Sequence, residues 1–420
     1  MKTLFVVHQF LPRHIAGSEL YTYHLAKALQ RRGHEVCVYT TEAYVDRETS
    51  ELTQKEWDGI PVWEAVHNNT VATFEESYLD EEKEAQFRRV LDDVQPDVVH
   101  VQHLHQHSIG YLDIAHERGL PIVYTLHEYL LMCLRFGWLV RPGWVLCDGP
   151  DPSACAACAE HLPLPRAPAP AGQPPYLAAV EERQRVIAEA LDKVDLFVSP
   201  SRFLRQRFVD TGLIAADRIL YSDNGIPTAA FQGLRRTPSE TLRFGFVGTI
   251  AEWKGVHLIV EAFDGLPEEG VDCQIWGVLE YFPDYVDRLR REAKHPGIRF
   301  CGRFENDKIG QILAGIDVLI VPSLWFENSP LTIHEAFLAG TPVVTADQGG
   351  MAEYVEPGKN GLHFRMHDAA DLRKQLRRLI EEPGLRASLT EFPELKEIET
   401  DAALTEERYR ALLAGRRPTG

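Results

Sequence analysis

The sequence predicts an α/β protein built from two Rossmann-like, doubly wound lobes. Short apolar runs of strand length alternate with helical stretches in the first half of the chain. The second half repeats this plan, and the two halves meet near residues 226–241. Such alternation is typical of a mostly parallel sheet with helices on both faces. We therefore expect two similar lobes, with a ligand cleft between them that faces the carboxyl ends of the strands.

The first lobe should span residues 1–225. It is expected to begin with a strand at 4–7, followed by a helix from about Ser18 to Arg32 that Gly33 ends. Its other strand candidates are the apolar runs 35–40, 97–101, 121–126 and 195–199. Between Leu130 and Tyr176 the alternation fails, and the prolines of 163–175 exclude a helix or a central strand. We interpret residues 130–176 as an insertion.

The second lobe should span residues 226–385, with a C-terminal helical segment at 386–420. Its strand candidates are 243–247, 273–276, 298–301, 318–321 and 342–345. Helices are expected near 255–264, 284–294, 307–315 and 330–339.

Composition excludes several classes of function. The chain has 420 residues, of which 45% are hydrophobic and 25% charged, as in an ordinary globular protein. A formal net charge of −18 argues against a nucleic-acid partner and against strong attraction to an anionic membrane. The sequence contains no apolar run near the 18 residues that could span a bilayer, and its first residues do not resemble a signal peptide. We expect a cytoplasmic protein, with peripheral contact at the cytoplasmic membrane face left open.

The segment from Glu327 to Gly340 carries the strongest functional signal. Ser329 is a good N-cap residue, Pro330 suits the first position of a helix, and Gly340 should end it. The unpaired N–H groups at such a helix start attract phosphate. Because Glu327 precedes this anion site and Glu335 lies inside the helix, the pattern suits a ligand with a central diphosphate and hydroxyls at both ends, such as a nucleotide-sugar. A glycoside hydrolase is the rival reading, but its carboxyls stand about 5–9.5 Å apart, whereas a fully helical 327–335 would separate these by about 12 Å.

Other motifs occur in a fixed order along the chain. They are Ala16-Gly17-Ser18-Glu19, Tyr124-Thr125-Leu126-His127, Ser222-Asp223-Asn224-Gly225-Ile226, Phe246-Val247-Gly248-Thr249 with Lys254-Gly255, Val321-Pro322-Ser323, Gly340-Thr341-Pro342-Val343-Val344, Gly349-Gly350-Met351-Ala352-Glu353 and Gly358-Lys359-Asn360-Gly361-Leu362. With the 327–335 segment, this set resembles the retaining glycosyltransferases of family 4. The matching motifs span residues 4 to about 365.

The resemblance implies the GT-B fold, in which the last helix, here Leu404–Leu413, crosses back onto the first lobe. It implies an acceptor-side first lobe and a second lobe that binds the nucleotide-sugar. Glu335 would accept hydrogen bonds from the ribose, and Glu327 would stabilise positive charge at the anomeric carbon. The N–H groups of Asn328, Ser329 and Leu331 would approach the sugar or diphosphate.

The remaining site residues also follow from the resemblance. His127 would contact the transferred sugar. Gly17 and Ser18 would let the backbone approach the donor phosphate or the acceptor, although they could equally cap their helix. Lys254, at the head of a helix, is a chemically reasonable phosphate ligand.

The chain departs from its relatives at Thr249, where many carry an arginine after the strand glycine. One diphosphate cation is therefore missing or supplied elsewhere, and Arg303 is the candidate.

Two metal hypotheses were weighed. His103, His105 and His107 would share one face if this stretch were a strand, but we favour polar lining of the ligand cleft over a metal site. Cys133, Cys147, Cys155 and Cys158 have the spacing C-x13-C-x7-C-x2-C inside the insertion. Structural zinc is favoured for these four, with an iron–sulfur cluster or unligated thiols as alternatives. Cys37, Cys273 and Cys301 lie in apolar strands and should be buried small hydrophobes.

The favoured function is retaining transfer of a hexosyl group from a nucleotide-diphosphate sugar to a hydroxyl acceptor, which could be a glycan, a lipid-linked sugar or a small molecule. UDP is favoured over GDP as the nucleotide because it is common among relatives. The chain contains no Asp-x-Asp, which supports transfer without a catalytic metal or other cofactor. The alternatives are an epimerase or phosphorylase on the same fold, or a catalytically weak nucleotide-sugar-binding protein. A dehydrogenase is disfavoured, since no G-x-G-x-x-G follows either first strand.

Overall fold

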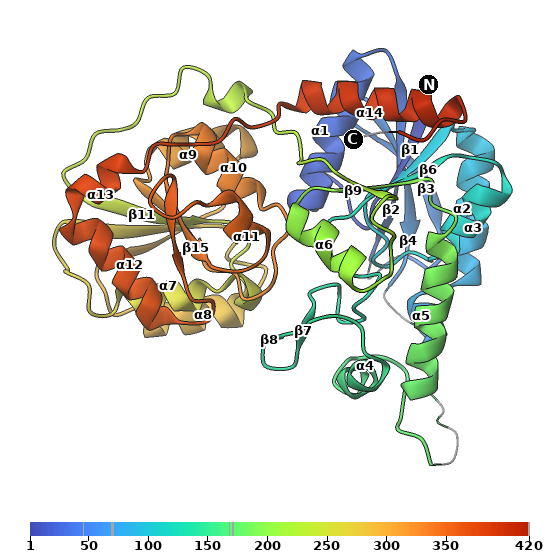
Figure 1. Cartoon of the computed structure of the whole chain (residues 1–420), viewed down its shortest axis with the longest axis horizontal. Coiled ribbons are helices and arrows are strands. Elements are labelled where there is room, and N and C mark those ends of the chain that lie inside the picture. The colour runs from blue at the N-terminus through green and yellow to red at the C-terminus, as the bar shows by residue number, and fades with distance from the viewer. Residues whose placement is uncertain (45, 69–70, 168, 170–171, 419–420) are drawn as a thin grey trace. The chain divides into compact units, whose positions relative to one another are not determined.

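The chain divides into two units, each organised around its own sheet. The computed structural model describes residues 1–44, 46–68, 71–167, 169 and 172–418. The first unit comprises Met1–Gly225 together with Ile398–Gly420, and the second comprises Ile226–Glu397. The last helix therefore belongs to the first unit rather than to a separate segment (Figure 1).

The first unit contains an eight-stranded sheet in the described part of the chain. Its order is β10-β9-β6-β5-β1-β2-β4-β3, and every neighbouring pair is parallel except β3 and β4. The strands are β1 (Lys2–Val6), β2 (Glu35–Glu42), β3 (Leu52–Trp57), β4 (Ile60–Val66), β5 (Val98–Val101), β6 (Ile122–Thr125), β9 (Leu196–Ser199) and β10 (Ile219–Tyr221). The predicted strands of this half are all present. The β3–β4 hairpin was missed because β3, Leu-Thr-Gln-Lys-Glu-Trp, is mostly exposed and has no apolar run.

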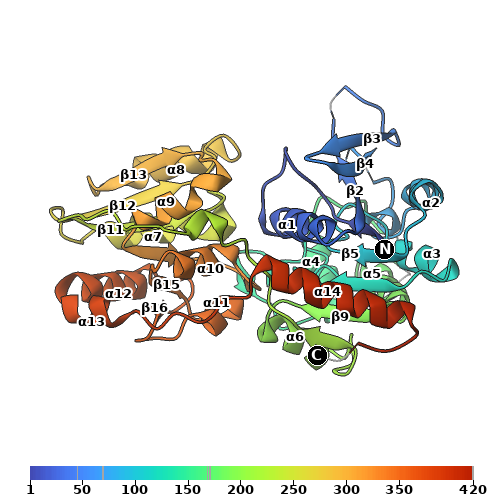
Figure 2. The same ribbon diagram turned by 90° about the horizontal axis from the view of Figure 1, so that it is seen from above.

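Helices cover this sheet and close its core. They are α1 (Gly17–Arg31), α2 (Glu81–Val94), α3 (Tyr111–Glu117), α5 (Leu177–Leu191), α6 (Arg202–Asp210) and α14 (Ile398–Leu413). Leu25 and Leu29 of α1 are fully buried in one core cluster with Val36 and Val38 of β2. Helix α14 lies alongside α1 in both views (Figures 1 and 2).

Helix α14 is held to the first unit by buried polar contacts as well as by packing. Asp401 is 1% exposed and accepts hydrogen bonds from the Tyr21 hydroxyl at 2.8 Å and from the Gly225 N–H at 2.9 Å. The Tyr409 hydroxyl lies 2.5 Å from His100 Nδ1 in β5. Because these groups are out of water, each needs its partner.

The insertion of the first unit has little regular structure. It contains the two-residue strands β7 (Val140–Arg141) and β8 (Val145–Leu146) and the helix α4 (Pro152–Ala159), whose N-cap is Asp151. Residues 168 and 170–171 of the proline-rich stretch lie outside the described residues.

The second unit contains a six-stranded parallel sheet with the order β13-β12-β11-β14-β15-β16. The strands are β11 (Leu242–Val247), β12 (Val271–Trp276), β13 (Ile298–Gly302), β14 (Val318–Val321), β15 (Val343–Ala346) and β16 (Gly361–Phe364). The helices are α7 (Val256–Phe263), α8 (Pro283–Glu292), α9 (Ile309–Ala314), α10 (Leu331–Leu338), α11 (Gly349–Tyr354), α12 (Ala369–Glu381) and α13 (Pro383–Ser388). Counted in chain order, the sheet reads 3-2-1-4-5-6, the doubly wound order of a Rossmann fold.

The cysteines outside the insertion are less buried than expected. Cys273 is fully buried. Cys37 of β2 and Cys301 of the edge strand β13 are only partly covered. No helix among the described residues is long and apolar enough to cross a membrane.

Candidate functional site

The strand order of the second sheet reverses between β11 and β14. The site residues predicted in this half of the chain follow these two strands. Strand β11 is the first of the unit and pairs with β12 on one side and β14 on the other. Ligands of doubly wound sheets bind beyond the carboxyl ends of the strands at such a point. Thr249 and Lys254 follow β11, and Glu327 follows β14, so the fold brings them to the same edge.

Glu327 lies at the centre of a buried hydrogen-bond network. Its side chain is 8% exposed, and its Oε1 accepts from Lys254 Nζ at 2.5 Å, Ser323 Oγ at 2.8 Å and Trp325 Nε1 at 3.0 Å. Three donors on one oxygen fix the carboxylate and satisfy its charge. The lysine of the predicted phosphate site and the predicted catalytic carboxylate thus form one ion pair.

Glycine residues permit this arrangement. Gly255, at φ +69°, follows Lys254, and a Cβ added to it would lie 2.0 Å from the carbonyl oxygen of Pro322. A side chain there would push the Lys254 turn away from the end of β14. Likewise, a Cβ on Gly350 would lie 1.6 Å from the carbonyl oxygen of Asn328. Both glycines therefore allow backbone segments to close around Glu327.

Helix α10 begins one residue later than the sequence predicts. Ser329 is not its N-cap, and Pro330 is not its first residue, because Pro330 is extended (ψ 109°) and occupies the N-cap position. The Ser329 hydroxyl instead accepts a hydrogen bond from the Tyr354 hydroxyl at 3.3 Å. Leu331 is the first helical residue, and Gly340, at φ +68°, follows the helix as predicted.

Glu335 lies in the middle of α10 in densely packed surroundings. Its side chain is partly exposed, yet desolvation raises its pKa to about 7, with the neighbouring His334 acting weakly in the opposite direction. The described residues donate no hydrogen bond to its carboxylate. A carboxylate kept in this state is a ready acceptor for ligand hydroxyls.

Two residues predicted to bind the nucleotide-sugar, Thr249 and Arg303, have a weaker structural basis at this site. Thr249 is half-buried beside Gly248 at the end of β11, and its carbonyl group accepts a hydrogen bond from Ala251 N–H at 3.0 Å. Arg303 is exposed and follows β13, three strands away from β14, which is about 14 Å at 4.8 Å per strand. The structure therefore does not bring Arg303 to the Lys254–Glu327 pair.

In the first sheet the corresponding point lies between β1 and β5. His8 follows β1, and its ring centroid lies 4.1 Å from that of His103, which follows β5. His8 Nε2 is also 3.5 Å from the buried carboxylate of Glu19. Burial lowers the pKa of His8 to about 3, with a smaller contribution from His14, so the ring is neutral at pH 7.

Gly17 and Ser18 form the first turn of α1 but do not cap it. The N-cap is Ala16, and no side chain accepts a hydrogen bond there. Ser18 Oγ donates to Glu19 Oε2 at 2.9 Å instead. A Cβ added to Gly17 would meet nothing within 4 Å, so neither packing nor a positive φ demands a glycine. The capping interpretation is wrong, and open space beside Gly17 agrees with ligand approach.

His127 follows β6 and is oriented by a neighbouring strand. Its Nε2 lies 2.8 Å from Oε1 of Gln102, which follows β5, so Nε2–H is the donor when the Gln102 oxygen accepts. Burial lowers the pKa of His127 to about 3, with a smaller contribution from His8. A neutral imidazole in a fixed orientation can exchange hydrogen bonds with a sugar hydroxyl over the whole physiological pH range.

His103, His105 and His107 lie beyond the end of a strand, so they do not share the strand face that the disfavoured metal reading requires. Strand β5 ends at Val101, and the three histidines lie in the following loop. His107 Nε2 lies 2.9 Å from the carbonyl oxygen of Val7, and His103 Nδ1 accepts from the His105 N–H. Within the described ranges, no three His, Cys, Asp or Glu side chains stand close enough together to hold a metal ion.

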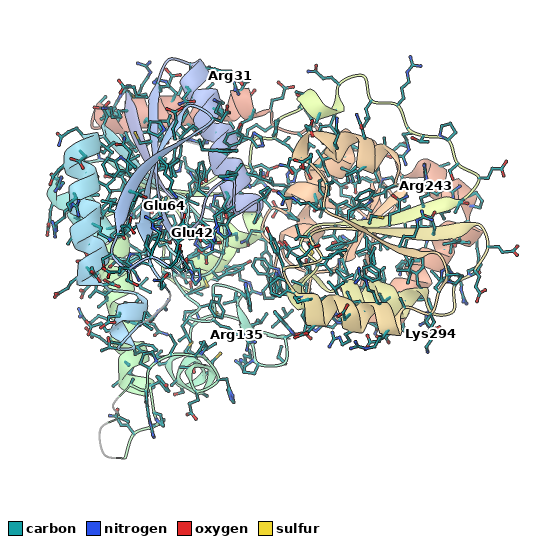
Figure 3. All side chains as sticks on the ribbon, turned by 180° about the vertical axis from the view of Figure 1, so that it is seen from behind. Arg31, Glu42, Glu64, Arg135, Arg243 and Lys294 are labelled. Atoms are coloured by element: carbon teal, nitrogen blue, oxygen red, sulfur yellow. The ribbon has the colours of Figure 1, made fainter. Side chains whose placement is uncertain are left out.

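Sequence reasoning missed several residues around these sites. Three of them each make one side-chain hydrogen bond to a site residue: Ser323, Trp325 and Gln102. Of these, only Ser323 lay in a motif recognised in the sequence, Val321-Pro322-Ser323. Two buried carboxylates at the other edge were also missed. Glu42 ends β2 and binds His14 Nε2 at 2.8 Å, and Glu64 of the neighbouring β4 binds Lys55 at 2.6 Å; both are labelled in Figure 3.

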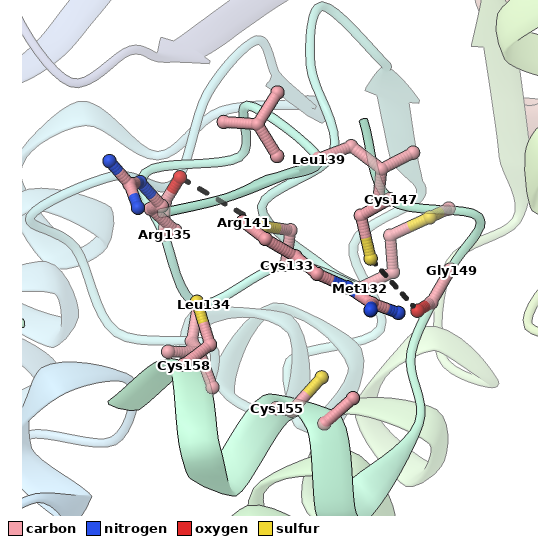
Figure 4. Close-up of a pocket in the computed structure, with 12 residues that line it drawn as sticks. Met132, Cys133, Leu134, Arg135, Leu139, Arg141, Cys147, Gly149, Cys155 and Cys158 are labelled. Atoms are coloured by element: carbon pink, nitrogen blue, oxygen red, sulfur yellow. Dashed lines mark hydrogen bonds between the residues drawn. The ribbon is translucent and has the colours of Figure 1, made fainter. Parts of the chain in front are cut away.

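The four cysteines of the insertion line one small pocket (Figure 4). Cys155 and Cys158 project from α4, Cys133 follows the turn after β6, and Cys147 directly follows β8. The sequence predicted this grouping. With the side chains as they stand in the described residues, no three of the four are close enough together to hold a metal ion.

The two sheets with their strand orders define the GT-B fold, and solved structures confirm this fold. HepE of Anabaena, solved with UDP and glucose, matches at a TM-score of 0.67 over 98% of this chain and 100% of its own, with 19% identity. Sucrose-phosphate synthase of Thermosynechococcus elongatus matches at 0.72 over 99% of both chains, with 16% identity.

The family follows from the sequence matches. The model of Glycosyltransferase Family 4 matches residues 15–230, and that of Glycosyl transferases group 1 matches residues 234–393. The chain belongs to Glycosyltransferase Family 4.

Curated relatives are matched over only part of their length. The chain is 24% identical to sulfoquinovosyl transferase SQD2 of Arabidopsis thaliana over 69% of this chain and 51% of that protein. It is 31% identical to a D-inositol 3-phosphate glycosyltransferase of Corynebacterium jeikeium over 37% of this chain and 39% of that protein. The matched region thus spans about half or less of these relatives.

Proposed function

We propose that the protein transfers a hexosyl group from a nucleotide-diphosphate sugar to a hydroxyl acceptor, with retention of configuration. The observation that carries this proposal is the Lys254–Glu327 pair, held beside the start of α10 and the hydroxyl acceptor Glu335. Lys254 and the start of α10 suit a diphosphate, Glu327 suits the transferred sugar, and Glu335 suits a ribose.

In this proposal each group has a defined task. The Lys254 ammonium keeps two protons beyond the one directed at Glu327, and they would bind diphosphate oxygens. The backbone N–H groups at the start of α10 would share that negative charge. Glu327, fixed through Oε1 by three donors, would place its other oxygen toward the transferred sugar and stabilise positive charge at the anomeric carbon.

The acceptor hydroxyl would be deprotonated by the departing diphosphate as the new glycosidic bond forms on the same face. The acceptor oxygen bonds to the anomeric carbon, the bond from that carbon to the diphosphate breaks, and the acceptor proton passes to the diphosphate. His127 would hydrogen-bond to the transferred sugar as a neutral group. The charges for this step come from Lys254 and the helix start, so no catalytic metal is required by the proposal.

UDP is the proposed nucleotide, supported by the HepE complex with UDP, which shares the fold. The class of acceptor stays open among glycans, lipid-linked sugars and small molecules. We propose a cytoplasmic location, with peripheral membrane contact if the acceptor is a lipid.

The anomeric configuration of the product tests the reaction. NMR of the product should give the same configuration as the donor, and activity should persist in excess EDTA. An inverted linkage would overturn the retaining assignment. A UDP-sugar incubated without acceptor should stay unchanged for many turnover times, whereas rapid epimerisation would favour an epimerase.

Thr249 favours one alternative, a nucleotide-sugar-binding protein with weak turnover, because it replaces a diphosphate cation of the relatives. Thr249→Arg distinguishes the two. If the missing cation limits catalysis, this substitution should raise kcat; if Lys254 and the helix start suffice, kcat should not increase.

A further inference from the structure

The insertion of the first unit carries a chemical group that glycosyl transfer does not use. From the four cysteines and the arginines around them, we propose that residues Cys133, Cys147, Cys155 and Cys158 bind one structural zinc ion as four thiolates. The site is separate from the Lys254–Glu327 pair, which belongs to the second unit.

Convergence of the four side chains is the first observation. Three separate chain segments between residues 132 and 158 each contribute to the same cavity of about 20 Å³. Cys155 and Cys158 are separated by about one turn of α4 and project from it toward the other two (Figure 4). A space of this size admits one ion or a water but no organic cofactor.

The donor set selects the ion. Four soft thiolates favour tetrahedral zinc in a closed structural site, with Zn–S distances of about 2.3 Å. As the side chains stand, the sulfurs of Cys133 and Cys147 are directed at the carbonyl oxygens of Arg135 and Gly149, at 3.9 and 3.4 Å. These weak S–H contacts would be replaced by metal–sulfur bonds after rotation about each Cα–Cβ bond.

Positive charge around the pocket is the second, independent observation. Zinc with four thiolates carries a net charge of −2, which needs compensation when buried. Arg135 and Arg141 line the pocket, and the Nε of Arg135 is buried without a hydrogen-bond partner among the described residues. The part of the chain that the structure describes contributes no Asp or Glu to the pocket lining.

Arg183 of α5, the helix that packs against α4, supplies further positive charge. It is 5% exposed, donates to the carbonyl oxygen of Leu130 at 2.7 Å, and lies within electrostatic range of Cys133 and Cys155. Among the described residues it forms no ion pair with a carboxylate. The carboxyl of Glu128 also interacts with Arg183, but burial raises its pKa to about 8, so that this group is neutral at pH 7. A buried cation without an anion is costly, and a zinc–thiolate centre would satisfy it.

The backbone of the insertion also requires external support. Phe136, Leu139 and Trp144, none of them glycine, have positive φ angles of 52–62°. This left-handed conformation is strained for a residue with a side chain and persists only where surrounding structure holds it. A metal that joins the turn at Cys133, the β7–β8 hairpin and α4 would provide that support.

Elemental analysis of the purified full-length chain is the direct test. We expect about one zinc per chain, and four thiols that react with a thiol reagent only after a chelator removes the metal. Replacing zinc with Co²⁺ should give the visible bands of a tetrahedral cobalt–thiolate centre. Metal-free protein with all four thiols reactive would overturn the proposal, as would iron with acid-labile sulfide or a Cys155–Cys158 disulfide.

Matched cysteine variants locate the site. Cys155→Ser combined with Cys158→Ser should reduce zinc to well below one per chain, whereas Cys301→Ser, a partly exposed cysteine of the second unit, should retain it. Retention of a full zinc in the double variant would exclude α4 as a source of ligands. If the double variant fails to fold, the cobalt spectrum of the unmodified chain still decides.

Arg183 variants test the charge argument. Arg183→Met should weaken zinc binding about tenfold or more in a chelator competition, as second-shell changes commonly do, and Arg183→Lys should recover most of the loss. Equal affinity in Arg183→Met and the unmodified protein would show that buried charge does not support the metal. UDP binding should be unaffected by these variants, so the result is independent of the proposed transferase activity.

Discussion

Glu327 and Glu335 differ in how the protein compensates the burial of their carboxyl groups. Glu327 is compensated by three donors on one oxygen, including Lys254 at 2.5 Å. Glu335 has no such partner among the described residues, and desolvation raises its pKa to about 7. The carboxyl group of Glu327 is therefore held in a fixed place, while that of Glu335 remains able to accept hydrogen bonds from ligand hydroxyls.

Glu335→Gln should stabilise the folded protein at high pH while weakening its binding of the nucleotide-sugar donor. The unfolded carboxyl has a pKa near 4.5 and the folded one near 7, so the folded state favours the protonated form. The cost of ionising it is absent below about pH 4.5, grows as the pH rises toward 7 and is then constant. The variant should thus be about 1–3 kcal/mol more stable than the unmodified chain at pH 8 and equal to it at pH 4.5 in urea titrations.

The same variant should bind UDP about tenfold more weakly, since a charge-assisted hydrogen bond is replaced by a neutral one. Isothermal titration at pH 8 measures this directly. An unchanged Kd would mean that Glu335 does not contact the ribose.

His127→Ala should lower kcat more than donor affinity, because its proposed contact is with the reacting sugar. Gln102→Ala is the matched control for positioning, since the side-chain oxygen of Gln102 hydrogen-bonds to the imidazole. We expect a smaller loss of kcat in Gln102→Ala, by about tenfold or less. A rise in donor Kd with kcat unchanged would contradict the placement of His127.

The loops after β11 and β14 depend on close backbone approach, which a sequence expresses only through glycine. The motifs around Gly255 and Gly350 predicted a site, and the strands that end at it were predicted within one or two residues. Ser323 and Trp325 could not be identified as donors to Glu327, because that role depends on where β14 ends relative to the loop. The start of α10 was misplaced by one residue because the extended ψ of Pro330 is set by the packed loop rather than by its intrinsic φ.

Gly350→Ala should abolish donor binding with a modest effect on folding. The added Cβ would lie 1.6 Å from the Asn328 carbonyl oxygen, and the loop that carries Glu327 must move. Gly384→Ala is the control, because a Cβ there meets nothing within 4 Å. It should be neutral or stabilise α13 by about 0.4–1 kcal/mol. Normal UDP binding by Gly350→Ala would disprove the steric argument.

Trp325→Phe should reduce kcat/KM about 10- to 100-fold by removing one of the three donors to Glu327. Hydrogen bonds to charged groups contribute about 1.5–3 kcal/mol, which sets this range. UDP affinity should change little, because the indole is not proposed to touch the nucleotide. Steady-state kinetics with the donor varied would separate the two effects.

The division of the chain into two α/β units was predictable because each half repeats the strand–helix pattern. The placement of α14 was expected from the family resemblance alone, since its apolar residues indicate a helix but not the sheet that it covers. Its attachment depends on Asp401, a charged residue that is 1% exposed, and the sequence alone offers no reason to bury it. The β3–β4 hairpin was missed for the converse reason, because an exposed edge strand needs no apolar pattern.

Asp401→Ala should destabilise the first unit by about 2–4 kcal/mol. The Tyr21 hydroxyl and the Gly225 N–H would both lose their buried acceptor. Glu399→Ala is the control on the same helix, because its ion pair with Arg31 is half-exposed and contributes about 1 kcal/mol or less. Urea unfolding followed by hydrogen exchange should assign the loss to the first unit, and equal effects of the two variants would contradict this account.

Helix α14 also fixes an order of events during synthesis. The first unit needs residues 398–413, which the ribosome delivers only after the roughly 170 residues of the second unit. At about 5–20 residues per second, Asp401 follows Tyr21 and Gly225 by some tens of seconds at the slower rate, and the second unit is fully translated before the first can be completed. The nascent first unit must therefore persist without its last helix, with the sites for Asp401 and Tyr409 unfilled. A premature stop codon before residue 398 would leave the first unit in this state.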